Sequence, residues 1–149
     1  PTWQDIGVHV AALRSLIPPG EIEVSADVKG LEIFADPLLE KVFGNLIDNS
    51  RRHGERVRHI TISSMPCGQD TLAIVYEDDG VGVQESDKER IFENGFGKNT
   101  GLGLFLTREI LGITGLSIKE LGVYGKGARF EILVPKGKFR FVKPAAAQE

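Results

Sequence analysis

The spacing of apolar residues changes several times along the chain, and each spacing predicts a different element. From Trp3 to Ile17 the apolar residues recur every three or four positions, which is helical spacing, and Pro18-Pro19-Gly20 ends the pattern. The next segments, "EIEVSADV" and "LEIFA", predict two short strands separated by Lys29-Gly30. The chain therefore starts with one helix followed by two strands.

A second amphipathic helix is predicted from Asp36 to about Gly54. Asp36 is a favourable N-cap, and Pro37 suits the first helical position because its missing N–H has no helical partner there. The spacing predicts a buried stripe made of Leu38, Leu39, Val42, Phe43, Leu46 and Ile47.

The second half of the chain mixes strands and helices without regular alternation. Strands are predicted at "HITISSM" and "TLAIVYE", joined by "PCGQD", and again at "LSIKEL" and "ARFEILVP". "DDGVGV" is a loop, "SDKERIF" predicts a turn or two of helix, residues 101–114 a full helix, and "KPAAAQE" a frayed tail. We expect an α/β (α+β) two-layer fold, a sheet with helices on one face.

Length, charge and cysteine content limit the possible classes. With 149 residues the chain suits one compact domain, and its net charge of -3 comes without a basic stripe, so neither nucleic acid nor a membrane surface is an expected partner. The single Cys67 and the absence of an apolar signal or spanning segment predict a reducing, cytoplasmic setting. Because the sequence opens inside a helical pattern without methionine, we expect a piece of a longer protein.

The polar face of the helix at 36–54 is the first candidate for chemistry. Lys41, Asn45, Asn49 and Arg52 share this face, and each asparagine costs a helix roughly 0.5 kcal/mol relative to alanine. Amide oxygens one turn apart suit Mg²⁺, a hard cation that takes few protein ligands and keeps several waters. An ordinary solvated face is the alternative reading.

Two glycine-containing loops are the other candidates. Asp78 ends an apolar strand and could accept a hydrogen bond from an exocyclic amine, with Gly80 and Gly82 close to a flat ring; a hairpin turn is the alternative. In "IFENGFGKNTGLGLFLTREIL", Gly101 and Gly103 begin a helix whose free N–H groups suit phosphate; the alternative is a flexible loop. The dinucleotide and P-loop glycine patterns do not fit this run.

The order of the motifs is more specific than any one of them. "NLIDNSRRH", "EDDGVGV", "IFENGF", "NTGLGL" and "GKGARF" follow one another between residues 36 and 135. This order resembles the ATP-binding catalytic domain of histidine protein kinases, in the superfamily shared with DNA gyrase, heat-shock chaperones and mismatch-repair ATPases. The resemblance implies a Bergerat fold, with a mostly antiparallel sheet and ATP held under a mobile lid.

The resemblance also implies roles for individual residues. Asn49 corresponds to the Mg²⁺ ligand, Asp78 to the adenine-reading aspartate, and Phe92 and Phe96 to the anchors of the lid. Asn45, Asn49 and Arg52 are the implied catalytic residues. The implied ATP-binding residues are Asn45, Asn49, Arg52, His53, Asp78, Gly80, Gly82, Val83, Phe96, Lys98, Gly101, Leu102, Gly103 and Leu104.

Three departures from the family pattern stand out. Arg52 replaces a common lysine, which keeps the charge but changes the donor geometry. Ala128 lacks the hydroxyl that many relatives carry, and only "GKNT" separates Phe96 from Gly101, so the lid is short. Lys98 is our candidate for reaching the phosphates.

Asn45 bears on the reaction, because a neutral amide cannot act as a general base. We therefore expect transfer of the γ-phosphoryl group to a histidine rather than rapid hydrolysis. His9, His53 and His59 do not match the phosphoacceptor motif, so the acceptor is expected on a separate histidine-bearing dimerisation domain. Residues 1–20 would be the connecting segment and residues 21–149 the catalytic domain. We expect this chain to be monomeric alone. A response regulator would be only an indirect partner.

Three other functions remain open at this point. A regulatory module could bind the nucleotide without transferring phosphate, since binding residues alone do not prove turnover. A slow gyrase-type ATPase is disfavoured by Asn45. A purely structural domain would leave the two asparagines and the paired glycines without a reason.

Overall fold

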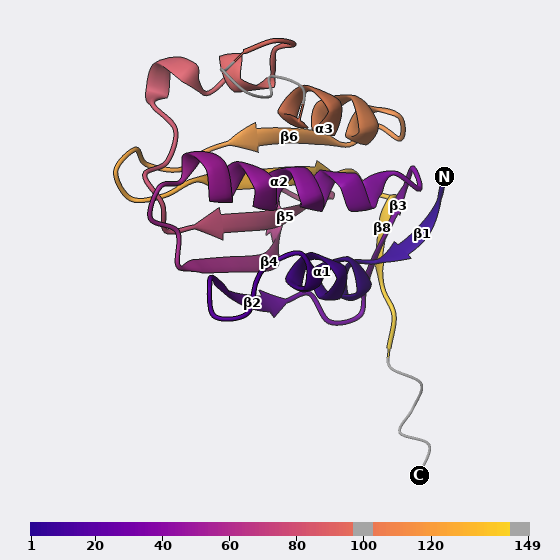
Figure 1. Ribbon diagram of the computed structural model, residues 1–149. Helices are drawn as coiled ribbons and strands as arrows, with labels where there is room; N and C mark the ends of the chain where they lie inside the picture. Colours follow the sequence, from indigo (N-terminus) through magenta and orange to yellow (C-terminus); the bar gives the residue numbers. More distant parts are fainter. Residues whose placement is uncertain (97–102, 144–149) are drawn as a thin grey trace.

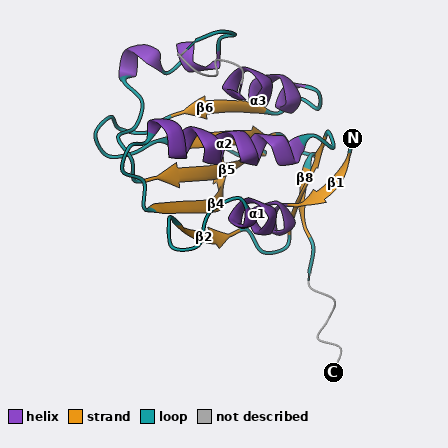
Figure 2. Cartoon of the chain, in the orientation of Figure 1, coloured by secondary structure: helices purple, strands orange, loops and turns teal. Residues whose placement is uncertain are grey.

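The computed structural model describes residues 1–96 and 103–143 of the chain (Figures 1 and 2). The described elements are, in order, β1 (Thr2–Asp5), α1 (Ile6–Ser15), β2 (Glu23–Asp27), β3 (Leu31–Ala35), α2 (Leu39–His53), β4 (His59–Cys67), β5 (Thr71–Asp78), the 3-10 turns η1 (Glu85–Asp87) and η2 (Arg90–Phe92), α3 (Gly103–Gly112), β6 (Ser117–Glu120), β7 (Arg129–Val134) and β8 (Phe139–Phe141).

The main sheet has five strands in the order β2-β4-β5-β7-β6. Only β2 and β4 are parallel, and every other neighbouring pair in this sheet is antiparallel. Helices α1, α2 and α3 cover one face of it, with α2 across the centre (Figure 1). The predicted two-layer fold with helices on one face is confirmed.

The core lies between this sheet and the helices. Alternate residues of the central strands point into it, among them Ile62, Ile74 and Phe130, as the period of a strand requires. From α2 the core receives Leu39, Val42, Phe43, Leu46 and Ile47. Leu38 was predicted in the same stripe, but it is 44% exposed because the helix has not yet begun at this residue.

Helix α2 begins two residues after Pro37, the predicted first helical position. The Asp36 carboxylate accepts a hydrogen bond from the Leu38 N–H at 2.8 Å, and the Asp36 carbonyl accepts one from the Leu39 N–H at 2.9 Å. These bonds close a turn at Pro37 instead of a helical first turn, so α2 begins at Leu39. Its C-terminal end at His53, next to Gly54, agrees with the prediction.

The predicted helix from Trp3 to Ile17 is also partly wrong. Residues 2–5 form β1, the edge strand of a second sheet with the order β1-β3-β8, and the helix begins only at Ile6. Trp3 lies beside Phe34 of β3, with ring centroids 5.6 Å apart, and under the guanidinium of Arg140 at 4.1 Å. This long-range pairing outweighs the local helical spacing, and the sequence did not predict β8.

The first 20 residues pack against the rest of the domain. Ile6, Val10 and Leu13 of α1 are buried in the common core, and β1 is paired with β3 along its whole length. Their use as a connecting segment stays a prediction. The "GKNT" run and the tail from residue 144 lie outside the described residues. Among the described residues, none of the helices has the length and apolarity that crossing a membrane requires.

Candidate functional site

A cavity of about 300 Å³ lies between α2, the loop after β5, the start of α3 and the loop of residues 121–128. This volume falls at the lower end of small-molecule pockets. Its described lining combines apolar and polar side chains: Asn45, Asp48, Asn49, His53, Gly54, Glu55, Asp78, Val81, Gly82, Val83, Gln84, Asp87, Ile91, Phe96, Gly103, Leu104, Tyr124 and Ala128.

Asp78 is the most firmly held polar group of the cavity. One carboxylate oxygen accepts the N–H groups of Gly80 and Ala128, both at 3.0 Å, and the other accepts the Ser50 hydroxyl at 2.6 Å. Ser50 in turn lies 2.7 Å from the Tyr76 hydroxyl. Burial raises the pKa of Tyr76, so this phenol stays a neutral donor. The carboxylate is 8% exposed, and its orientation is fixed before any ligand arrives.

The glycines next to Asp78 are required by packing within the chain. A Cβ on Gly80 would lie 2.6 Å from the Gly54 carbonyl oxygen, and one on Gly82, at φ +80°, would lie 2.8 Å from the Gly127 carbonyl oxygen. Gly127 itself adopts φ +144°, and its backbone touches Asp78. These close approaches explain the glycines without a ligand, whereas the sequence interpretation assigned them to a flat ring.

The opposite end of the cavity is formed by Asn45 and the beginning of α3. The Asn45 amide donates to the Gly103 carbonyl at 2.9 Å and to the Thr107 hydroxyl at 3.2 Å. Thr107 also donates to the Gly103 carbonyl at 2.9 Å. Asn45 therefore joins the first described turn of α3 to the middle of α2, a role that the sequence did not indicate.

The structure brings most of the predicted site residues to this one cavity. Those that line it are Asn45, Asn49, His53, Asp78, Gly82, Val83, Phe96, Gly103 and Leu104. Arg52 and Gly80 do not line it; Arg52 is exposed and donates to Asp48 at 3.1 Å, one turn earlier on α2. Lys98, Gly101 and Leu102 lie outside the described residues. The ligand roles of all these residues stay predictions.

Sequence reasoning missed several lining residues, notably Asp48, Glu55, Asp87 and Tyr124. Asp48 could have been found, because it lies three residues after Asn45 and so faces the same side of the helix. Glu55 has φ +62° and is the non-glycine residue with positive φ in the described chain, a conformation that sequence does not reveal. Asp87 ends the 3-10 turn η1 and Tyr124 sits in a loop, and the positions of both segments depend on tertiary contacts.

The two phenylalanines of "IFENGF" have different surroundings. Phe92 is buried against Phe130, with ring centroids 6.3 Å apart, and the Arg108 guanidinium of α3 lies 4.5 Å above its ring. Phe96 lines the cavity, and Arg90 lies 4.9 Å over its ring. Phe92 thus fixes η2 to the sheet and to α3.

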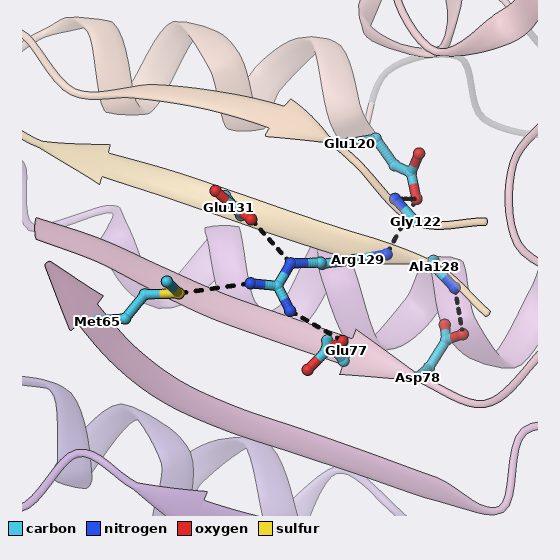
Figure 3. A network of polar contacts seen from close by, with 8 residues as sticks. All are labelled: Met65, Glu77, Asp78, Glu120, Gly122, Ala128, Arg129 and Glu131. Atoms are coloured by element: carbon cyan, nitrogen blue, oxygen red, sulfur yellow. Dashed lines mark hydrogen bonds and ion pairs between the residues drawn. The ribbon is translucent and has the colours of Figure 1, made fainter. Parts of the chain in front are cut away.

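Arg129 organises the other face of the sheet next to Asp78 (Figure 3). Its guanidinium donates to Glu131 at 2.8 Å, lies 3.1 Å from the Glu77 carboxylate and reaches the Met65 sulfur at 3.5 Å. Hydrogen bonds to Glu131 and Glu77 raise the pKa of Arg129. This network ties β7 to β5 where the Ala128 N–H meets Asp78.

Comparison with known proteins gives a consistent result. The family model described as "Histidine kinase-, DNA gyrase B-, and HSP90-like ATPase" matches residues 35–138. The chain is 34% identical over 137 residues to the alginate biosynthesis sensor protein KinB of Pseudomonas aeruginosa, with 83% of this chain and 22% of the relative covered. It is 35% identical over 117 residues to the sensor protein ChvG of Rhizobium meliloti, and this match covers 65% of this chain and 19% of ChvG. The chain thus spans about a fifth of the length of these relatives.

Among solved structures, the chain is similar to the catalytic domain of the histidine kinase ThkA. The TM-score is 0.73 at 25% sequence identity, and the match covers 91% of this chain and 95% of that one. The two-layer arrangement of sheet and helices therefore agrees with the fold of this catalytic domain.

Proposed function

The chain belongs to the family of histidine kinase-, DNA gyrase B- and HSP90-like ATPases, and we propose that it is the ATP-binding catalytic domain of a two-component sensor histidine kinase. In this proposal the domain binds ATP·Mg²⁺ and transfers the γ-phosphoryl group to a histidine on a separate helical dimerisation domain. A response regulator would receive the phosphoryl group from that histidine, so it is only an indirect partner of this domain.

The observation that carries the proposal is the fixed carboxylate of Asp78 at one end of the cavity. Three donors hold it, yet a carboxylate has about four acceptor positions, so one lone pair remains for a ligand. An exocyclic amine such as that of adenine is the complementary donor. The apolar side chains of Val81, Val83, Ile91 and Leu104 line the same space and suit a flat ring.

Gly103 supports the placement of the phosphates at the other end. A Cβ there would meet no atom of the described chain closer than 3.7 Å, the distance to the Asn45 amide. Packing within the described chain therefore does not require a glycine at this position. A close approach of phosphate oxygens to the start of α3 would require one, because the helix dipole and the free N–H groups favour an anion there.

Asn49 fits the metal that accompanies ATP. Among the described residues no group of three or more His, Cys, Asp or Glu side chains could hold a cation, so this part of the chain does not supply such a metal site. Mg²⁺ bound to nucleotide phosphates needs only one or two protein oxygens. Asn49 lines the cavity and its amide oxygen would provide one, while the bound Mg²⁺ would neutralise phosphate charge.

Replacement of this amide should weaken ATP binding only when Mg²⁺ is present. In Asn49→Leu we expect the ATP dissociation constant to rise by about 10-fold with Mg²⁺, because the metal loses one protein ligand. In EDTA it should change little. Calorimetric titration with ATP and with a non-hydrolysable analogue measures both values. Asn94→Leu, an exposed asparagine outside the cavity, is the control. An equal loss with and without metal would exclude Asn49 as a ligand.

The surroundings of Asn45 favour transfer over hydrolysis. Its amide nitrogen is used to hold Gly103 and Thr107, and its neutral oxygen cannot take a proton from water. Catalysis would then depend on positioning of the phosphoryl group and neutralisation of its charge. These are properties of the cavity and not of a single acid or base.

Phosphoryl transfer is the direct test. We expect the chain with labelled ATP and Mg²⁺ to form no acid-labile, alkali-stable phosphohistidine by itself, and to label a histidine-bearing dimerisation domain of the same family when it is added. The acceptor domain with its histidine changed to alanine is the control. Labelling of His9, His53 or His59 in the isolated chain would contradict a separate acceptor. Tight ATP binding without any transfer would favour a regulatory module instead.

A further inference from the structure

The loop of residues 121–128 carries an exposed aromatic residue into the cavity. Tyr124 lines the cavity, and it is 55% exposed. The sequence motifs gave it no role, and its ring is not part of the hydrophobic core.

The backbone around Tyr124 is held on both sides. The Gly125 N–H donates to the Val81 carbonyl at 2.6 Å, and the Arg56 guanidinium donates to the Gly125 carbonyl, also at 2.6 Å. Val123 and Gly127 form a β-bridge across the loop. A rigid loop with an exposed side chain presents the ring at a defined place with little ordering cost on binding.

Further contacts fix the base of the same loop. Lys88 donates to the Gly122 carbonyl at 2.9 Å and to the buried Glu120 carboxylate. The other oxygen of Glu120 accepts the N–H groups of Gly122 and Arg129, at 3.1 and 2.9 Å (Figure 3). The loop is thus joined to the segment before η2 as well as to its own strands.

The position of the loop identifies the end of the cavity that Tyr124 borders. Gly82 packs against the carbonyls of Val123 and Gly127, and Gly127 touches the Asp78 backbone. Tyr124 therefore belongs to the end of the cavity with Asp78 and Ala128. Asn45 and Gly103, near which we place the phosphates, border the other end.

We propose that Tyr124 is a specificity-determining residue that stacks on the nucleobase whose amine Asp78 binds, an inference that rests on the proposed ATP site. An aromatic ring on a flat base is favoured by dispersion and by removal of both surfaces from water. Ala128 leaves room beside the base because its side chain is a single methyl group. Because Tyr124 lines the cavity and is 55% exposed, its ring would cover the base on the solvent side.

The expected result is a loss of affinity that depends on the base. Tyr124→Ala should weaken ATP binding by about 10-fold, whereas Tyr124→Phe should keep it within about twofold, because the phenyl ring stacks equally well. Binding of inorganic tripolyphosphate should be the same in all three proteins. Val123→Ala changes an exposed residue of the same loop that does not line the cavity, and it is the matched control.

A direct readout uses the two tyrosines of the chain, Tyr76 and Tyr124. In protein with isotope-labelled tyrosine, nuclear Overhauser contacts should join the adenine ring protons to the Tyr124 ring. The Tyr124 signal is assigned from the Tyr124→Phe variant, in which it is missing. If ATP binds with Asp78-dependent affinity but Tyr124→Ala matches the parent and the ring contacts are missing, the stacking role is wrong. If ATP does not bind the parent chain, the proposed function itself is wrong.

Discussion

Asp78→Asn should bind ATP about 30-fold more weakly and should no longer prefer ATP to GTP. In the parent, the free lone pair of the carboxylate accepts the adenine amine, and hydrogen bonds to a charged group contribute about 1.5–3 kcal/mol. In the variant the amide NH₂ faces that amine, donor against donor. Guanine presents a carbonyl at the same place, which the new NH₂ can satisfy, so GTP should gain relative affinity.

Asparagine is the informative substitution because it preserves the local fold. Its oxygen can accept the N–H groups of Gly80 and Ala128, and its nitrogen can donate to Ser50, whose hydroxyl proton can turn elsewhere. Alanine would leave all three donors unpaired in a buried place and would add a cost of folding to the cost of binding. Calorimetric titration with ATP and GTP, combined with urea unfolding, separates the two effects.

The neighbouring Asp79 provides the control. Partial burial acts to raise its pKa, but hydrogen bonds from the Arg58 and His59 N–H groups and from the His59 ring together outweigh burial and lower it. Asp79 does not line the cavity, so Asp79→Asn should leave the ATP dissociation constant within about twofold. Unchanged ATP affinity in Asp78→Asn would show that the base is bound elsewhere.

The contrast between Asp78 and the residues around it shows what sequence could predict. A carboxylate at the end of an apolar strand is a local signal, and the structure places Asp78 in the cavity with Asn45 and Asn49, whose helix spacing is equally local. The packing reason for Gly80 could not be predicted, because its close partner, Gly54, is distant in sequence and follows the end of α2. A local sequence pattern can identify a residue as a candidate for the site. Why that residue type is needed depends on its contacts with residues that are distant in sequence.

The same distinction explains the errors in the fold. Trp3 and Ile6 have helical spacing, but the pairing of β1 with β3 spans about thirty residues and cannot be read from either segment alone. Tyr124 carried no signal, since an exposed aromatic in a turn has no periodicity. Glu120 was interpreted only as part of a strand, although its side chain is fully buried and meets Lys88, a lysine from the segment before η2.

Glu120→Gln should destabilise the domain by about 3 kcal/mol, although it changes one oxygen into one nitrogen. All described partners of this carboxylate are donors: Lys88, the Gly122 N–H and the Arg129 N–H. An amide NH₂ must face one of them, and the ammonium of Lys88, 14% exposed, loses its counter-charge. Removing one partner of a buried ion pair typically costs about 3–5 kcal/mol. Urea unfolding measures the change.

The double variant Glu120→Gln with Lys88→Met distinguishes this explanation from a general packing defect. Methionine removes the unpaired charge and keeps much of the side-chain volume. The loss of unfolding free energy in the double variant should therefore be smaller than the sum of the losses in the two single variants, by at least about 1 kcal/mol. Glu93→Gln, at an exposed position, should change stability by less than about 0.5 kcal/mol. Additive effects would show that Lys88 and Glu120 are not coupled.

Because the pair also holds the base of the Tyr124 loop, Glu120→Gln should weaken ATP binding even at temperatures where the domain stays folded.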